Sequence, residues 1–348
     1  MKGDKLDKID IKSLNATELS ENLDYLSLPK FRVTQIYEWV RRGVGSFAEM
    51  TNVPATLREK LDDKFYFADV KIARKLVSKL DGTVKYLFEL ADGEFIESVF
   101  MSYHHGYTVC ISTQVGCRMG CKFCASGING KARDLTAGEM LAQIEAAARD
   151  NGVRVSNVVM MGMGEPLDNF RNSMKFLELV GDEKGLGIGM RHISLSTSGV
   201  VDGIYKLAEY NLPITLSISL HAPIDELRSS VMPVNKRWNL AELFKACKDY
   251  IKVTGRRISF EYALIDGFND SDECIKKLAE SVKGMLCHIN LIPANPVVEN
   301  DFRSPERKKV EDFQKKLESY GLTTTIRRTL GADINASCGQ LRRSEANK

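Results

Sequence analysis

The sequence contains no long hydrophobic run: no window of its 348 residues approaches the roughly 18 consecutive apolar residues that a transmembrane helix needs. It also lacks the apolar core of a secretion signal, because its first 20 residues are rich in polar and charged side chains. An excess of charge of one sign is absent too, because 49 Lys and Arg residues nearly balance 46 Asp and Glu residues and the formal net charge is only +3. We therefore expect a cytoplasmic protein without a membrane anchor. The small net charge neither requires nor excludes a nucleic-acid partner.

The composition is that of a globular protein, with 43% hydrophobic and 27% charged residues. The chain is long enough for one large domain and a smaller one. It has eight cysteines, and in a reducing compartment we do not expect them to form a disulfide framework. Cysteines that cluster in such a chain indicate metal or redox chemistry.

Three regions with different hydrophobic periodicity divide the chain. Residues 1–66 have apolar positions at helical spacing and no catalytic cluster, which predicts a small helical accessory domain that contacts RNA if RNA is the substrate. Residues 67–106 alternate with a period of two around the turn signal Asp92-Gly93, which predicts a β-hairpin linker or extension. In residues 107–343, strand-like runs alternate with helical patterns.

The alternating region predicts an α/β fold, a partial (β/α) barrel with a parallel sheet inside and helices outside. Its strand-like runs are YTVCIST, SNVVMMG, HISLSTS, PITLSISL, RISFEYAL, CHINLIP and TTTIRR. In such barrels the functional groups lie at the carboxyl ends of the strands. The cysteine-rich stretch VGCRMGCKFCASG follows the first run, where this rule places a site.

This stretch places Cys117, Cys121 and Cys124 in a C-x-x-x-C-x-x-C pattern. Thiolates bind zinc or iron–sulfur clusters. A structural zinc site usually closes four ligands as two separated pairs, and no second pair is evident. A [4Fe–4S] cluster held by three thiolates leaves one iron open, and we favour this interpretation. The alternative is a zinc ion completed by one nearby side chain: His104, His105 or Cys110.

The three-cysteine pattern, with Phe123 before its last cysteine, resembles that of the radical S-adenosylmethionine (SAM) superfamily. In that superfamily the open iron chelates the amino and carboxylate groups of SAM. The resemblance implies that Gly164 and Glu165 of MGMGEP accept hydrogen bonds from the SAM ammonium. It places further cofactor contacts at later strand ends: Ser196, Ser219, Leu220, His221 and Asn295. As a dinucleotide fingerprint this stretch fails, because Leu167 stands where the third glycine of G-x-G-x-x-G belongs.

Two cysteines outside this loop have informative surroundings. Strand alternation turns Cys110 into the barrel if Val109 and Ile111 face the outer helices. Cys338 lies in a segment with flanking glycines after the last strand-like run. The other three cysteines outside the loop are expected to be small buried hydrophobic residues: Cys247, Cys274 and Cys287.

Longer stretches resemble the RlmN-type radical-SAM methyltransferases: QVGCRMGCKFCASG, MGMGEPLDN, ISLSTSGVV, LSISLHAP, EYALIDGFNDS, NLIPANPV and GADINASCGQL. The resemblance spans residues 20–343. It implies methylation of carbon 2 of an adenine in 23S rRNA, with a [4Fe–4S] cluster and two SAM molecules per turnover. Some members of the family also act on a tRNA. An electron donor such as flavodoxin or ferredoxin is implied as a partner, and we expect a monomer.

The resemblance also implies roles for three residues. Cys338 takes a methyl group from one SAM, and a 5′-deoxyadenosyl radical from the second SAM abstracts hydrogen from that methyl group. The resulting methylene radical adds to carbon 2 of adenine, and Glu97 of EFIESVF removes the carbon-2 proton. Cys110 then attacks the Cys338 sulfur, which forms a transient disulfide and releases the product.

Basic residues that could hold RNA phosphates recur at Lys71, Arg74, Lys75, Lys79, Lys85, Lys236, Arg237 and the Arg pairs at 327–328 and 342–343. Two other functions stay open. The chloramphenicol–florfenicol resistance methyltransferases use the same machinery on carbon 8, although Pro166 favours the carbon-2 type. A zinc-stabilised RNA-binding protein without catalysis would contain zinc in place of iron and sulfide.

Overall fold

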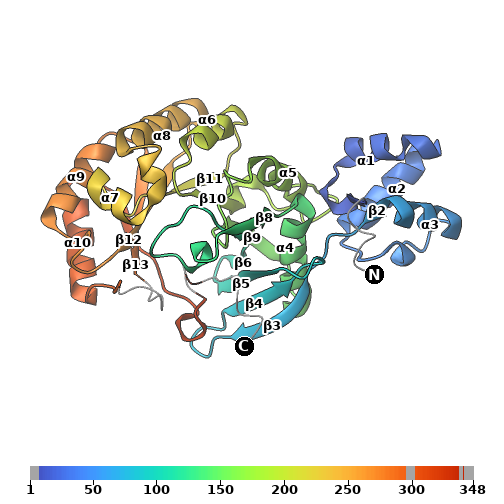
Figure 1. The fold of residues 1–348 in the computed structure, drawn as a ribbon, viewed down its shortest axis with the longest axis horizontal. Coiled ribbons are helices and arrows are strands. Elements are labelled where there is room, and N and C mark those ends of the chain that lie inside the picture. The colour runs from blue at the N-terminus through green and yellow to red at the C-terminus, as the bar shows by residue number, and fades with distance from the viewer. Residues whose placement is uncertain (1–7, 295–301, 337–339, 341–348) are drawn as a thin grey trace.

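A computed structural model gives the fold and describes residues 8–294, 302–336 and 340. Its centre is a ten-stranded sheet with the strand order β14-β13-β12-β11-β10-β9-β6-β5-β4-β3. The strands from β6 and β9 to β14 are parallel, whereas β3, β4, β5 and β6 pair antiparallel. The sheet curves, and helices α4 to α6 and α8 to α10 lie along its outer side (Figure 1). The predicted α/β class with an N-terminal helical part is confirmed.

The helices are α1 Ala16–Leu23, α2 Lys30–Arg41, α3 Ala55–Lys64, α4 Ala137–Asn151, α5 Phe170–Val180, α6 Val201–Glu209, α7 Asp225–Val231, α8 Leu240–Thr254, α9 Asp272–Val282 and α10 Arg307–Ser319. The strands are β1 Ile9–Asp10, β2 Phe65–Tyr66, β3 Lys71–Val77, β4 Val84–Glu89, β5 Phe95–Tyr103, β6 Gly106–Cys110, β7 Gln114–Gly116, β8 Lys131–Asp134, β9 Val155–Met160, β10 Ile193–Thr197, β11 Thr215–Ser219, β12 Ile258–Leu264, β13 Cys287–Pro293 and β14 Thr324–Ile326. Among the described residues, no helix is long and apolar enough to cross a membrane.

Local sequence signals fix several helix ends. Helices α1, α4 and α8 each begin with a capping box. In this motif the side chain of the cap residue accepts a hydrogen bond from the backbone amide of a glutamate three residues later, and the side chain of that glutamate accepts one from the backbone amide of the cap residue. The caps are Asn15, Thr136 and Asn239. Gly152 and Gly255 end α4 and α8 in the left-handed conformation, which glycine adopts without steric cost.

The apolar side chains form two large cores. One lies between the central sheet and its helices. The other is made by residues between Ile11 and Phe65 of the N-terminal helices and loops. These N-terminal helices lie beside the sheet, at the end of the molecule where α4 and α5 are found (Figure 1). Each core supplies its own hydrophobic stabilisation.

Strands β4 and β5 continue the central sheet, because β5 pairs with β6 from Val99↔Cys110 to Tyr103↔Gly106. On β6, Val109 belongs to the main core, while Cys110 packs on the opposite face of the sheet with Val99. Strand alternation explains this arrangement, since neighbouring side chains point to opposite faces. The face that carries Cys110 is the inner face of the curved sheet.

The C-terminal segment 330–336 is held on the turn between β3 and β4 by two carboxylates. Asp333 accepts hydrogen bonds from the Ser78 hydroxyl (2.6 Å) and the Lys79 amide (2.9 Å). In return, Asp81 accepts from the Gly331 amide at 2.9 Å. Leu330 and Ala336 then pack in one cluster with Val99, Met101 and Cys110. The segment thereby lies against the inner face of β5 and β6.

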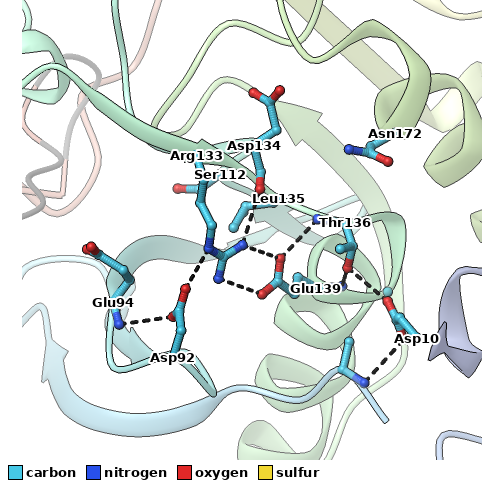
Figure 2. A network of polar contacts seen from close by, with 12 residues as sticks. Asp10, Asp92, Glu94, Ser112, Arg133, Asp134, Leu135, Thr136, Glu139 and Asn172 are labelled. Carbon is cyan, nitrogen blue, oxygen red and sulfur yellow. Dashed lines mark hydrogen bonds and ion pairs between the residues drawn. The ribbon is translucent and has the colours of Figure 1, made fainter. Parts of the chain in front are cut away.

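A polar network joins the N-terminal helical part to the start of α4 (Figure 2). Asp10 accepts from the hydroxyls of Ser13 (2.5 Å) and Thr136 (2.8 Å). Thr136 is the cap of α4, and its capping-box partner Glu139 receives two hydrogen bonds of 2.8 Å from the Arg133 guanidinium. Arg133 also contacts Asp92 at 2.6 Å, in the turn between β4 and β5. Three distant parts of the chain therefore meet at one helix end.

We expect Gly138→Ala to destabilise this junction. A methyl group there would lie 2.8 Å from Oδ1 and 2.9 Å from Cγ of Asp10, whose carboxylate is buried and held by several donors. Overpacking of this kind lowers the free energy of unfolding by about 1–3 kcal/mol. The higher helix propensity of alanine offsets part of this loss. Urea unfolding would measure the loss. Gly189→Ala is the matched control, because its nearest neighbour is 3.8 Å away. An unchanged Gly138→Ala midpoint would contradict the tight packing.

Candidate active site

A pocket opens at the carboxyl ends of the parallel strands and collects most of the predicted site residues. Its lining includes the three thiols of the cysteine loop and five residues from later strand ends: Cys117, Cys121, Cys124, Gly164, Glu165, Ser196, Ser219 and His221. Leu220 is not among them, because its side chain is fully buried in the main core. Asn295 and Cys338 lie outside the described residues, but Ala294 lines the pocket.

The cysteine loop is anchored at its base by a short antiparallel pair, β7 with β8. Asp168, which follows the Gly164-Glu165 turn, accepts from Gln114 at 2.8 Å and from Lys131 at 3.1 Å, and it also pairs with Arg118 of the loop. Burial raises the pKa of Asp168, but the bonds from Arg118, Gln114 and Lys131 outweigh it and hold the pKa below its usual value. One carboxylate thus ties both ends of the loop to the end of β9.

The three thiols are half-buried in the wall of the pocket. Burial, with a contribution from the neighbouring Cys124, raises the pKa of Cys117 to about 12. Burial also raises the pKa of Cys121, and Arg228 opposes that rise. Cys117 and Cys121 are therefore protonated at neutral pH, and metal binding must release their protons.

The donor set fits an iron–sulfur cluster. In the described part of the chain, no three His, Cys, Asp or Glu side chains are placed to hold a single metal ion. The three sulfurs instead border one pocket, and a cluster takes each thiolate on a different iron. His104 and His105, which were considered as a fourth zinc ligand, lie in the turn before β6, at the opposite end of that strand from Cys110.

The Gly164-Glu165 turn can exist only with glycine at its first position. Gly164 has φ +109°, and a Cβ atom there would lie 2.7 Å from both Cβ and N of Gln114. Glu165 is 3% exposed, and its two oxygens accept from the amides of Leu167 (3.1 Å) and Ser198 (2.7 Å). Burial raises the pKa of Glu165 in spite of these donors.

His221 is a neutral hydrogen-bond donor in this pocket. Burial, aided by Arg228, lowers the pKa of His221 to about 3, so its ring is uncharged at neutral pH. Its Nδ1 accepts from the Ala263 amide at 2.9 Å, which leaves the ring proton on Nε2. Phe123 of the cysteine loop packs edge-on against this ring, with 4.6 Å between centroids. Ser196 and Ser219 bring their hydroxyls within 3.5 Å of each other nearby.

Two of the predicted catalytic residues lie on the inner face of β5 and β6, apart from the residues that line the pocket. Glu97 is 1% exposed and forms an ion pair of 2.9 Å with Lys85, which is 4% exposed. Lys85 also donates to the Asn335 carbonyl of the C-terminal segment at 3.2 Å. Cys110 lies on the same face. Lys85 is therefore not a surface phosphate contact, and this part of the sequence prediction is wrong.

Sequence analysis missed several polar residues at the pocket. Glu261 of β12 lines it and accepts from Asn290 at 2.7 Å, with Arg327 at 3.8 Å. Arg327 lines it as well, although the sequence suggested only an RNA contact. Glu261 stands inside the strand-like run RISFEYAL, and a charged residue in a buried strand was the available signal. Of the cysteines expected to be buried, Cys247 and Cys274 are buried and Cys287 is half-buried.

Comparisons with known proteins agree with this geometry. Residues 111–280 match the family model of the Radical SAM superfamily. Residues 9–67 match that of the ribosomal RNA large subunit methyltransferase N-terminal domain.

Full-length relatives are similar over nearly the whole chain. A protein of Alkaliphilus oremlandii named probable dual-specificity RNA methyltransferase RlmN is 53% identical over 97% of this chain and 98% of its own. A protein of the same name from Clostridium novyi is 51% identical over 94% and 96%. Among solved structures, a radical SAM methyltransferase from Sphaerobacter thermophilus matches with a TM-score of 0.91 and 43% identity, over 96% of this chain and 99% of that one.

We expect Asp168→Asn to loosen the cysteine loop and lower the free energy of unfolding by about 1 kcal/mol at neutral pH. The contribution of a carboxyl whose folded pKa is depressed is complete above its unfolded pKa of about 3.9 and disappears as the pH falls through the lower folded pKa. The difference between wild type and variant should therefore be constant from pH 8 to pH 5 and shrink below about pH 4.

Chemical denaturation at several pH values would test this expectation. Asp249→Asn is the control, because the partners of Asp249 in the described structure are the exposed Lys245 and the exposed Tyr205, and we expect no measurable change there. A difference for Asp168→Asn that grew toward low pH would contradict the assignment.

Proposed function

The chain belongs to the RlmN family of radical SAM enzymes, and from this membership we propose that it methylates carbon 2 of an adenine in RNA. The observation that carries the proposal is the pocket in which the three loop thiols face the Gly164-Glu165 turn and the strand-end hydroxyls. We propose 23S rRNA as the substrate, with a tRNA as a second one. A protein electron donor such as flavodoxin or ferredoxin, a cytoplasmic location and a monomeric state complete the proposal.

Several side chains of the pocket have a proposed role in this reaction. Cys117, Cys121 and Cys124 would hold a [4Fe–4S] cluster, which together with bound SAM supplies one-electron cleavage of SAM to a hydrogen-abstracting radical. Glu165 is placed to accept hydrogen bonds from the SAM ammonium. The hydroxyls of Ser196 and Ser219 and the Nε2 proton of His221 would orient the rest of SAM, and Asn295 is proposed as a further contact.

The inner face of β5 and β6 supplies the remaining groups. Cys338 would carry the methyl group, since a thiolate displaces it readily from the sulfonium of SAM. Glu97 would accept the carbon-2 proton of the methylated base, and its ion pair of 2.9 Å with Lys85 holds its carboxylate in place on the inner face of β5. Cys110 would then resolve the Cys338 adduct by forming a disulfide. Packing of Ala336 in the cluster of Cys110 supports this pairing, because Cys338 follows two positions later.

Exposed cations near this face are suited to RNA phosphates. Strand β3 is an edge strand with its side chains in solvent, and it carries Lys71, Arg74 and Lys75, with Lys79 just after it. Charged side chains also protect a sheet edge from pairing with another chain. We propose that these cations and the N-terminal residues 1–66 bind the RNA electrostatically.

The test of the reaction is product analysis. Anaerobically reconstituted protein would be incubated with SAM, dithionite and a 23S rRNA fragment, and the digested nucleosides identified by mass spectrometry. We expect 2-methyladenosine. A peak of 8-methyladenosine would assign the protein to the resistance type, and bound zinc without iron and sulfide would remove the radical mechanism altogether.

We expect Cys338→Ala to abolish RNA methylation and to leave cluster binding intact, because it removes the methyl carrier and none of the cluster ligands. Iron and sulfide content and 5′-deoxyadenosine release would be measured beside the methylated nucleoside. Methylated RNA from this variant would contradict the carrier role. Cys274→Ala is the matched control, since Cys274 is a buried cysteine of α9.

Cys110→Ala should stop the reaction after the new carbon–carbon bond has formed, because nothing then releases the Cys338 sulfur. A covalent protein–RNA complex is expected as a shifted band in a denaturing gel. Cys247→Ala should show no such band, since Cys247 is a buried core residue of α8. Normal turnover without a band in Cys110→Ala would contradict the resolving role.

A further inference from the structure

Arg228 of α7 is a fully buried guanidinium beside the pocket, with an exposure of 0%. Its Nε donates to the Leu220 carbonyl (3.0 Å), and Nη2 donates to the carbonyls of Ser198 (2.6 Å) and Ser219 (3.0 Å). Nη1 donates to Oδ1 of Asn235 at 2.8 Å. Arg228 therefore ties together the carboxyl ends of β10 and β11, where Ser196 and Ser219 face the pocket.

All of these acceptors are neutral groups. A buried charge is costly unless a charge of opposite sign compensates it. In the described structure the nearest link to a carboxylate is indirect, since Asn235 uses its amide nitrogen to contact Asp225 at 2.8 Å. Burial lowers the pKa of Arg228 to about 10, so the side chain stays cationic at neutral pH. A cation has thus been placed in the interior without a carboxylate in direct contact.

The end of α7 lies on the cysteine loop. The amide of Lys122 donates to the carbonyl of Val231 at 2.9 Å. Val231 and Met232 pack in one cluster with Met119, Cys121 and Phe123 of the loop. The helix that carries Arg228 therefore packs directly on the loop whose sulfurs would carry negative charge in a cluster.

We propose that Arg228 is a positioning residue for the iron–sulfur cluster, whose fixed positive charge compensates the anionic cluster and raises its reduction potential. The inference rests on the proposed function. A [4Fe–4S]²⁺ cluster with three thiolates has a net charge of −1, and one electron from the reductant makes it −2 without forming or breaking a bond. A neighbouring cation stabilises the more negative state more strongly, so reduction becomes easier.

The test is an EPR-monitored dithionite titration of the reconstituted full chain without RNA. Arg228→Gln should lower the equilibrium constant for reduction about tenfold, which corresponds to a potential about 59 mV more negative for one electron. Arg228→Lys keeps the charge and should stay closer to wild type. Asp225→Asn removes the anion behind Asn235 and should shift the potential in the opposite direction.

Arg149→Gln is the matched control, because it removes the same charge from an exposed arginine near the end of α4 and should leave the potential unchanged. If Arg228 has only a structural role, Arg228→Gln should lower the thermal stability and the iron content of the protein. The clusters that still form would then have the same reduction potential as in wild type. This result would overturn the inference. If Arg228→Gln does not fold, Asp225→Asn decides: a potential equal to that of wild type would overturn the inference. A wild-type chain that binds no cluster would overturn the proposed function as well.

Discussion

Burial of charge is the constraint on which the interior of this protein depends. Glu165, Arg228, Glu97 and Lys85 are almost without solvent contact, and each would destabilise the fold if it were left uncompensated. The groups that compensate the buried charge differ among these four residues. Glu165 receives backbone amides, Glu97 and Lys85 pair with each other, and Arg228 receives carbonyls. Because those backbone groups come from strand ends and from the segment after β9, the charges also hold the strand ends in place.

The same geometry divides the chemistry into two regions. Residues at the carboxyl ends of the parallel strands are suited to an iron–sulfur cluster and SAM, while the antiparallel strands β4 to β6 present a carboxylate and a cysteine on their inner face. The parallel half provides polar groups because its strand ends open toward loops. The antiparallel half provides a surface on which the C-terminal segment lies, since Leu330 and Ala336 pack with Val99 of β5.

Features that depend on local pattern could be predicted, and features that depend on long-range pairing could not. The resemblance placed Ser196 and Ser219 at strand ends, where the structure has them lining the pocket, and alternation gave the orientation of Cys110. The hairpin expected around Asp92-Gly93 put Glu97 on the strand next to that of Lys85, but nothing local shows that segment 330–336 covers the face they share. Arg228 and Asp168 were missed for the same reason: each acts through groups that only the folded chain brings near.

The two carboxylates that hold segment 330–336 on the β3–β4 turn have a consequence for how the protein folds. Asp81 and Gly331 are 250 positions apart in the sequence, and the bonds of Asp333 to Ser78 and Lys79 span a similar separation. During synthesis, β4 and β5 are therefore made long before the segment that covers their inner face. Loop-closure entropy grows only slowly with length, so the separation in sequence does not prevent this late contact. The order of synthesis thus means that Glu97 and Lys85 can be covered only after residue 335 has been made.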